Sequence, residues 1–191
     1  MSEPVSVMDR AATAPRDTLA IEERGPVGQV TLRADLASPA VAEAVRATLG
    51  VELPETRTCA FGEDGRGAVW MAPDELLVLC GYDEAGDVAA RLEAALADEH
   101  ATAVVMSDAR AVLRLAGPDV AETLAKGAPV DLSGAAFPVG AARRTHLAHV
   151  AVGFWRREAV VWELVCFRSY AAYVWDWLVA SGAPGARVGR F

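Results

Sequence analysis

The sequence predicts an α+β fold: two strand–helix–strand–strand–helix units around a mostly antiparallel sheet. Three observations lead to this prediction. Short apolar runs are joined by tight turns, amphipathic helical stretches alternate with them, and the same order of elements begins again after about residue 107. Hairpin connections favour antiparallel pairing, and split βα units place the helices on one side of the sheet.

In the first half, residues 27–33 predict a strand that leads into a helix. Ser38 is a favourable N-cap and Pro39 suits the first helical position, while Gly50 supplies the C-terminal stop. Apolar residues at helical spacing predict the buried face of this helix: Val41, Val45 and Leu49. The other elements expected in this half are strands at 68–71 and 75–80 and a helix at 86–96. Residues 102–106 predict a short buried strand or the approach to one.

The second half repeats the pattern. We expect strands at 111–115, 145–152 and 159–167, a helix between Gly117 and Gly127, and a hairpin turn at Arg156 and Arg157. A last helix should begin at Ser169 and end at Gly182. Its predicted core stripe follows the i, i+3, i+4, i+7, i+8 template: Tyr170, Tyr173, Val174, Trp177 and Leu178.

The expected domain organisation has three parts. Residues 1–24 show no sustained period and predict an N-terminal arm that a partner orders. Residues 25–181 predict one compact domain of two pseudo-repeats, about 27–106 and 107–181. The Gly- and Ala-containing end, 182–191, predicts a loose tail.

Composition limits the possible partners and the compartment. The 191 residues are 53% hydrophobic and 23% charged, which is a globular composition, and the net charge is −8. This acidic balance argues against nucleic acid or an anionic membrane as a partner. Three widely spaced cysteines, Cys59, Cys80 and Cys166, favour a reducing compartment, and no secretory signal is recognisable, so we expect a cytoplasmic protein.

No motif predicts a catalytic, cofactor or metal site. His146 and His149 lie in a predicted strand, where odd spacing puts them on opposite faces. Gly62, Gly65 and Gly67 precede a strand rather than a helix, so they predict a hairpin loop and not a phosphate-binding loop. No GxSxG nucleophile motif is present.

Two residues of the last segment are predicted partner contacts. Trp175 lies off the expected core stripe and should therefore face solvent or a partner. Arg168 precedes the same helix, and a planar guanidinium is well suited to protein interfaces.

Three segments together carry a resemblance to a known family. The first is residues 70–77, WMAPDELL, which is similar to W-x-G-P-D-E-x-L with Ala72 in place of the glycine. The second is residues 107–132, SDARAVLRLAGPDVAETLAKGAPVDL, with Ala128 where the family often has cysteine. The third is residues 163–170, ELVCFRSY, which leads into WDWL. In this order the segments resemble the gamma subunit of heterotetrameric sarcosine oxidase.

The resemblance covers residues 27–180 and implies a subunit without cofactors of its own. It implies a fold like the folate-binding part of aminomethyltransferases, and alpha, beta and delta subunits as partners. The complex would oxidise sarcosine to glycine with formation of hydrogen peroxide and transfer the one-carbon unit to tetrahydrofolate. FAD, FMN and NAD would lie on the alpha and beta subunits and zinc on the delta subunit.

Two alternatives remain at the level of sequence. The chain could be a stand-alone folate-binding module similar to aminomethyltransferases. That family uses acidic residues near a glycine pair, whereas residues 143–149, RRTHLAH, contain neither. The chain could also be a binding module of unrelated function.

Overall fold

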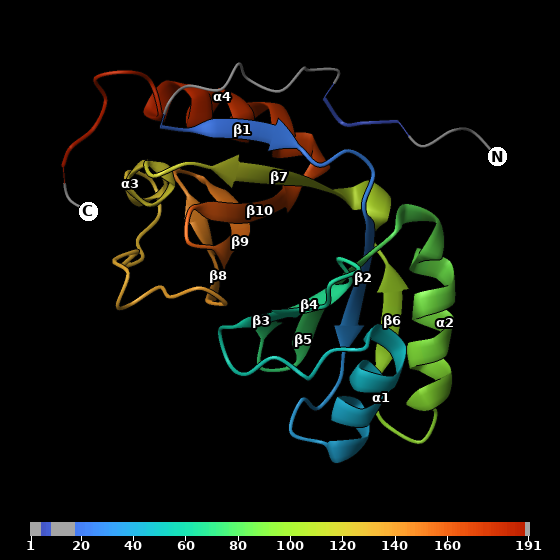
Figure 1. Ribbon diagram of the computed structural model, residues 1–191. Coiled ribbons are helices and arrows are strands. Elements are labelled where there is room, and N and C mark those ends of the chain that lie inside the picture. The colour runs from blue at the N-terminus through green and yellow to red at the C-terminus, as the bar shows by residue number, and fades with distance from the viewer. Residues whose placement is uncertain (1–4, 9–17, 190–191) are drawn as a thin grey trace. The chain divides into compact units, whose positions relative to one another are not determined.

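The computed structural model of the chain describes residues 5–8 and 18–189 (Figure 1). They form two compact units: a central unit, Val27–Asp108, and a terminal unit made of the described residues before Val27 and after Asp108. The elements of the central unit are β2 (Gly28–Arg33), α1 (Pro39–Leu49), β3 (Cys59–Phe61), β4 (Gly67–Ala72), β5 (Glu75–Cys80), η1 (Tyr82–Glu84), α2 (Ala85–Ala95), β6 (Thr102–Val105) and the start of η2 (Ser107–Ala109). Those of the terminal unit are β1 (Ala20–Glu23), β7 (Arg110–Ala116), α3 (Val120–Ala125), β8 (Ala142–Leu147), β9 (Val150–Glu158), β10 (Val161–Phe167), η3 (Arg168–Tyr170) and α4 (Ala171–Ser181).

The central unit is a five-stranded antiparallel sheet of order β3-β4-β5-β2-β6. Helices α1 and α2 lie beside one another on it (Figure 1). All six residues of β5 are buried, as its nearly continuous apolar sequence requires. Val41 and Leu92 from the helices and Leu32 from β2 belong to one buried apolar cluster. This cluster is the core of the unit.

Local sequence signals explain α1. The Ser38 hydroxyl accepts a hydrogen bond from the backbone N–H of Ala40, and Pro39 occupies the first turn. Gly50 ends the helix with φ 72°, where its N–H donates to the carbonyl of Arg46. The start and end predicted for this helix are therefore confirmed.

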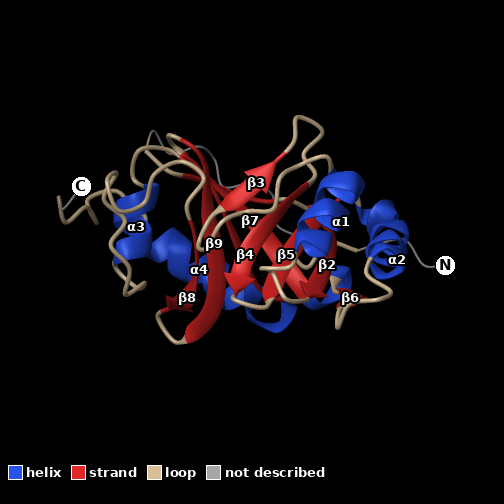
Figure 2. Ribbon diagram, turned by 90° about the horizontal axis from the view of Figure 1, so that it is seen from below, coloured by secondary structure: helices blue, strands red, loops and turns tan. Residues whose placement is uncertain are grey.

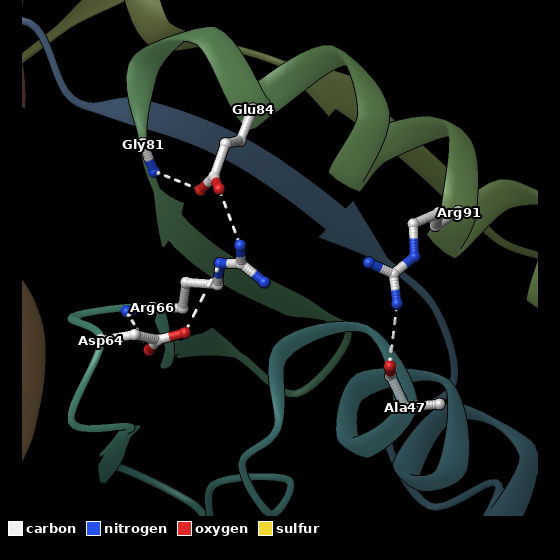
Figure 3. Close-up of polar contacts among 6 residues, drawn as sticks. All are labelled: Ala47, Asp64, Arg66, Gly81, Glu84 and Arg91. Atoms are coloured by element: carbon white, nitrogen blue, oxygen red, sulfur yellow. Dashed lines mark hydrogen bonds and ion pairs between the residues drawn. The ribbon is translucent and has the colours of Figure 1, made fainter.

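Polar contacts fasten the loops of the central unit (Figure 3). The Arg66 guanidinium lies between two carboxylates, 2.6 Å from Glu84 Oε1 and 3.6 Å from Asp64 Oδ2. Glu84 also accepts the N–H of Gly81 at 3.0 Å. Arg66 belongs to the β3–β4 loop, so Gly62, Gly65 and Gly67 sit in or beside a hairpin loop, as predicted.

The terminal unit is also a five-stranded antiparallel sheet, of order β1-β7-β10-β9-β8. Residues of α3 and α4, including Leu124 and Val174, share one buried cluster with the sheet. The Phe137 ring stacks on Trp162 with 4.8 Å between ring centroids, and Phe154 lies beside both. Aromatic packing thus fills the centre of this unit.

The two units have the same internal order of elements, which confirms the predicted α+β repeat with antiparallel pairing. In each unit the order along the chain is one strand, a helix, three strands and a second helix. Each sheet has one further strand at an edge, which is β6 in the central unit and β1 in the terminal unit. The expectation of one shared sheet is wrong, because each unit has its own. Each also has one more strand between its helices than predicted. The additional strand of the central unit, β3, is only three residues long, and the strand predicted at 145–152 covers parts of both β8 and β9.

The turn between β8 and β9 corrects the predicted strand bounds. The chain turns at Ala148 and His149, where Ala148 adopts φ 52° without a glycine or asparagine to signal the turn. His146 lies in β8 and His149 in this turn, so they do not share one strand. Arg156 and Arg157 lie within β9, not in a hairpin turn.

Part of the expected N-terminal arm is ordered by the chain itself. Ala20–Glu23 forms β1 and pairs with β7, and the Glu23 carboxylate accepts the N–H groups of Val7 and Met8. Residues 1–4 and 9–17 of the predicted arm lie outside the described residues.

The expected loose tail is likewise held where it is described. The Lys126 ammonium donates to the carbonyls of Ser181 and Ala186, both at 2.6 Å. The buried Glu122 carboxylate accepts the N–H groups of Val188 and Gly189. These contacts hold residues 181–189 against α3 and the residue that follows it.

The strand expected at 102–106 is found, but it is not buried. Three of the four residues of β6 are exposed. None of the helices in the described part of the chain combines the length and the apolar character that a membrane-spanning helix requires.

Candidate subunit interface

The junction between β10 and α4 exposes three aromatic side chains at intervals of three residues. They are Phe167, Tyr170 and Tyr173, with exposed fractions of 46%, 49% and 42%. Phe167 ends β10, Tyr170 closes the 3-10 turn η3 and Tyr173 lies in the first turn of α4. Positions three apart lie on the same side of a helix, so the two tyrosines share one face. We call these three residues the aromatic patch.

Two arginines flank the aromatic patch. Arg110 of β7 stands directly opposite Phe167, and its guanidinium carbon lies 5.9 Å from the centroid of the Phe167 ring. Arg168, the first residue of η3, donates to the backbone carbonyl of Val5 at 3.4 Å. Aromatic residues and arginine are the side chains enriched at protein–protein interfaces. Three exposed aromatic side chains beside two partly buried arginines therefore form a candidate binding surface.

The structure corrects the predicted exposure of Trp175. Its side chain is 5% exposed and lies in the core of the terminal unit with Val174 and Leu178, while Tyr170 and Tyr173 of the predicted core stripe are exposed. The same helix carries a second stripe of i, i+3, i+4, i+7 spacing, which is the one that packs: Ala171, Val174, Trp175 and Leu178. The predicted stripe began at Tyr170, which belongs to the preceding 3-10 turn. The reason for assigning Trp175 to a partner therefore no longer holds.

A buried carboxylate within β10 is a further feature that the sequence motifs do not predict. Glu163 of β10 is 3% exposed and accepts a hydrogen bond from Trp155 Nε1 at 2.9 Å. Arg24 forms an ion pair with it, and Arg157 lies 3.5 Å away. A glutamate inside the apolar strand VWELVCF is the signal that could have revealed the network. The hydrogen-bond and ion-pair partners of Glu163 come from β9 and from Arg24, the residue after β1, so Glu163 links the β1 segment to the sheet.

Two of the three cysteines, Cys80 and Cys166, are buried thiols. Burial raises the pKa of the Cys166 thiol to about 12 and that of Cys80 to about 11, so both thiols are protonated at neutral pH. Within residues 5–8 and 18–189, no three histidine, cysteine, aspartate or glutamate side chains gather as a metal site would require.

Comparison with known proteins places the chain in a family. Residues 33–184 match the model of the sarcosine oxidase, gamma subunit family. The chain is 36% identical to sarcosine oxidase subunit gamma of Corynebacterium sp. strain P-1 over 141 residues, which are 73% of this chain and 66% of that protein. It is 31% identical to the subunit gamma of Corynebacterium sp. strain U-96 over 175 residues, 91% of this chain and 84% of that protein. The match with the strain P-1 protein thus spans slightly less than two thirds of that protein's length.

Solved structures agree with this placement. A chain of the heterotetrameric sarcosine oxidase from Corynebacterium sp. U-96 matches with a TM-score of 0.78 and 29% identity, over 89% of this chain and 86% of that one. The glycine cleavage system aminomethyltransferase T from Bartonella henselae matches with a TM-score of 0.62 and 13% identity, over 86% of this chain and 46% of that one. The second match shows the fold alone. On the family match and the identities above, this chain belongs to the sarcosine oxidase gamma subunit family.

Proposed function

We propose that the chain is a non-catalytic gamma subunit of a cytoplasmic heterotetrameric sarcosine oxidase. The complex would demethylate sarcosine oxidatively to glycine, with hydrogen peroxide as a product and one-carbon transfer to tetrahydrofolate. The observation that carries the proposal is the match to a chain of a heterotetrameric sarcosine oxidase over 89% of the sequence. The partners would be alpha, beta and delta subunits.

In this proposal the chain binds the other subunits and supplies no catalytic residue. FAD, FMN, NAD, tetrahydrofolate and zinc would bind on the partner subunits. The buried thiols of Cys80 and Cys166 support this proposal, because their raised pKa values keep them protonated and poorly nucleophilic at neutral pH.

The aromatic patch is the proposed contact with a partner subunit, together with Arg168. Three exposed aromatic rings and the guanidinium of Arg168 match the composition of residues that dominate binding energy at interfaces. A stable assembly of subunits buries about 2,000 Å² or more, so the patch would be one part of a larger contact.

Co-expression with the flavin-bearing subunits of the same organism tests the proposal. The chain should elute with them on size exclusion at one copy per complex, and the complex should oxidise sarcosine. Tyr170→Ser with Tyr173→Ser should weaken copurification at least tenfold, whereas Val139→Ser, at a 56% exposed position elsewhere, should not. A wild-type chain that never elutes with these subunits would refute the proposal.

A stand-alone folate-binding module is the second candidate, because the fold is shared with aminomethyltransferase T. Calorimetric titration of the free chain with tetrahydrofolate separates the two. Micromolar binding to the free chain would favour the module, whereas our proposal expects no heat of binding.

A further inference from the structure

Strand β6 is the outer strand of the central sheet. It pairs through four residues with β2, and the sheet order ends there; Figure 2 shows it beside β2. Val104 and Val105 are 52% and 45% exposed. Successive side chains of a strand point to opposite faces, so these valines flank the edge on both sides.

The backbone pattern shows which groups of β6 point outward. The N–H of Met106 donates to the carbonyl of Gln29 at 2.7 Å, and Val105 stands opposite Val30. In an antiparallel pair, hydrogen-bonded and non-hydrogen-bonded positions alternate. The N–H and C=O groups of Val104 therefore point toward β2, whereas those of Ala103 and Val105 point away from the sheet.

Among the described residues, the other three sheet edges carry features that oppose further strand pairing. Strand β8 contains Arg143 and Arg144, and β1 contains Glu22 and Glu23. Strand β3 has only three residues. Charges and short length are the usual defences of an edge strand. By contrast, the run 101–107, ATAVVMS, has no charge and strong β propensity.

We propose that the β6 edge receives an extended strand from a partner subunit, which adds a sixth strand to the central sheet. This inference rests on the proposed function, because it needs a partner subunit. The outward N–H and C=O groups of Ala103 and Val105 would pair with the incoming backbone. Val104 and Val105 would contact apolar side chains of that strand on the two faces of the sheet.

A second copy of this chain is a poorer occupant. Two β6 edges paired with each other would join only four residues from each side. So short a contact buries far less than the ~1,000 Å² that a specific interface needs. A permanent subunit can supply a strand as one part of a larger interface.

Variants of the full chain, co-expressed with the flavin-bearing subunits, test the inference. Val105→Pro removes an outward N–H that β2 does not use, and proline is tolerated on an edge strand. Val104→Lys places on β6 the kind of charge that β8 carries. Val105→Thr keeps the N–H and the β-branched shape, and is the matched control. Circular dichroism melts of each free chain establish that it folds.

We expect the wild type and Val105→Thr to assemble alike, and Val105→Pro and Val104→Lys to bind at least tenfold more weakly. Hydrogen exchange at the amides of Ala103 and Val105 should slow at least 100-fold between the free chain and the complex. If Val105→Pro does not fold, Val104→Lys and the exchange measurement decide.

The outcomes separate this inference from the proposed function. If the wild-type complex forms, but both variants bind as tightly and the edge amides exchange as in the free chain, the inference is wrong and the proposed function stands. It is also wrong if the variants abolish only a dimer of the free chain. If the wild type does not assemble at all, both fail.

Discussion

Truncating Trp175 to alanine should destabilise the chain, whereas truncating Tyr173, two residues earlier, should not. Trp175 is 5% exposed within the apolar core of the terminal unit, and Tyr173 is 42% exposed. Loss of a buried tryptophan side chain costs about 3–5 kcal/mol, a large part of the ~5–15 kcal/mol that holds a typical domain together. An exposed side chain away from special features contributes within about 0.5 kcal/mol.

Thermal melts followed by far-UV circular dichroism measure the difference. For a chain of this size, about 1 kcal/mol corresponds to roughly 2–4 °C in melting temperature, so Trp175→Ala should melt roughly 6–20 °C below the wild type. Trp175→Phe, which keeps most of the buried volume, should recover part of the loss. A Trp175→Ala chain that melts within about 2 °C of the wild type, or a Tyr173→Ala chain that loses as much as it does, would show that the faces of α4 are misassigned.

Three further predictions concern other parts of the molecule. Gly117→Ala should lower the free energy of unfolding by several kcal/mol in urea melts, because Gly117 has φ 132° and an added Cβ would lie 2.3 Å from the carbonyl of Thr18; equal stability would contradict the close approach. The hydrogen bond from Arg66 lowers the pKa of Glu84 below its ordinary value of 4.5, so its stabilising contribution is present above that value and is lost as pH falls through the lowered pKa. Urea midpoints of the wild type and Glu84→Gln should therefore differ at pH 7 and converge in acid, and a constant difference would contradict this. In the native chain Cys166 should not react with a thiol reagent at pH 7, and it should react once urea unfolds the protein.

The elements that could be predicted are those whose causes are local. Ser38 and Pro39 act on the first turn of helix α1 and Gly50 acts on its last turn, so three residues determine where the helix begins and ends. The turn at Ala148 has no such signal, because the positive φ is imposed by the pairing of β8 with β9. The single strand predicted at 145–152 therefore corresponds to parts of two strands.

The faces of α4 show a different limit. Apolar and aromatic residues are so dense over residues 170–178 that two overlapping stripes satisfy the helical period. The choice between them depends on where the helix begins. Because a 3-10 turn occupies Arg168–Tyr170, the helix begins only at Ala171, and Tyr170 and Tyr173 of the predicted core stripe are exposed.

The edge strands depend on pairing over long distances in sequence. Strand β1 pairs Ala20 with Ala116, and the sequence of the whole central unit lies between these two residues. The residues around 20–23 therefore carry no local signal that predicts the strand. The position of β1 is explained by the sheet, because without β1 the strand β7 would be an unpaired edge. In the central sheet the same place belongs to β6, which covers β2 in the way that β1 covers β7. The two equivalent edges differ in one respect that the fold does not require: β1 carries Glu22 and Glu23, and β6 carries two exposed valines. The stability of the fold would allow charged residues on both β1 and β6. Strand β6 has none, and this is the composition expected of an edge strand that pairs with a partner.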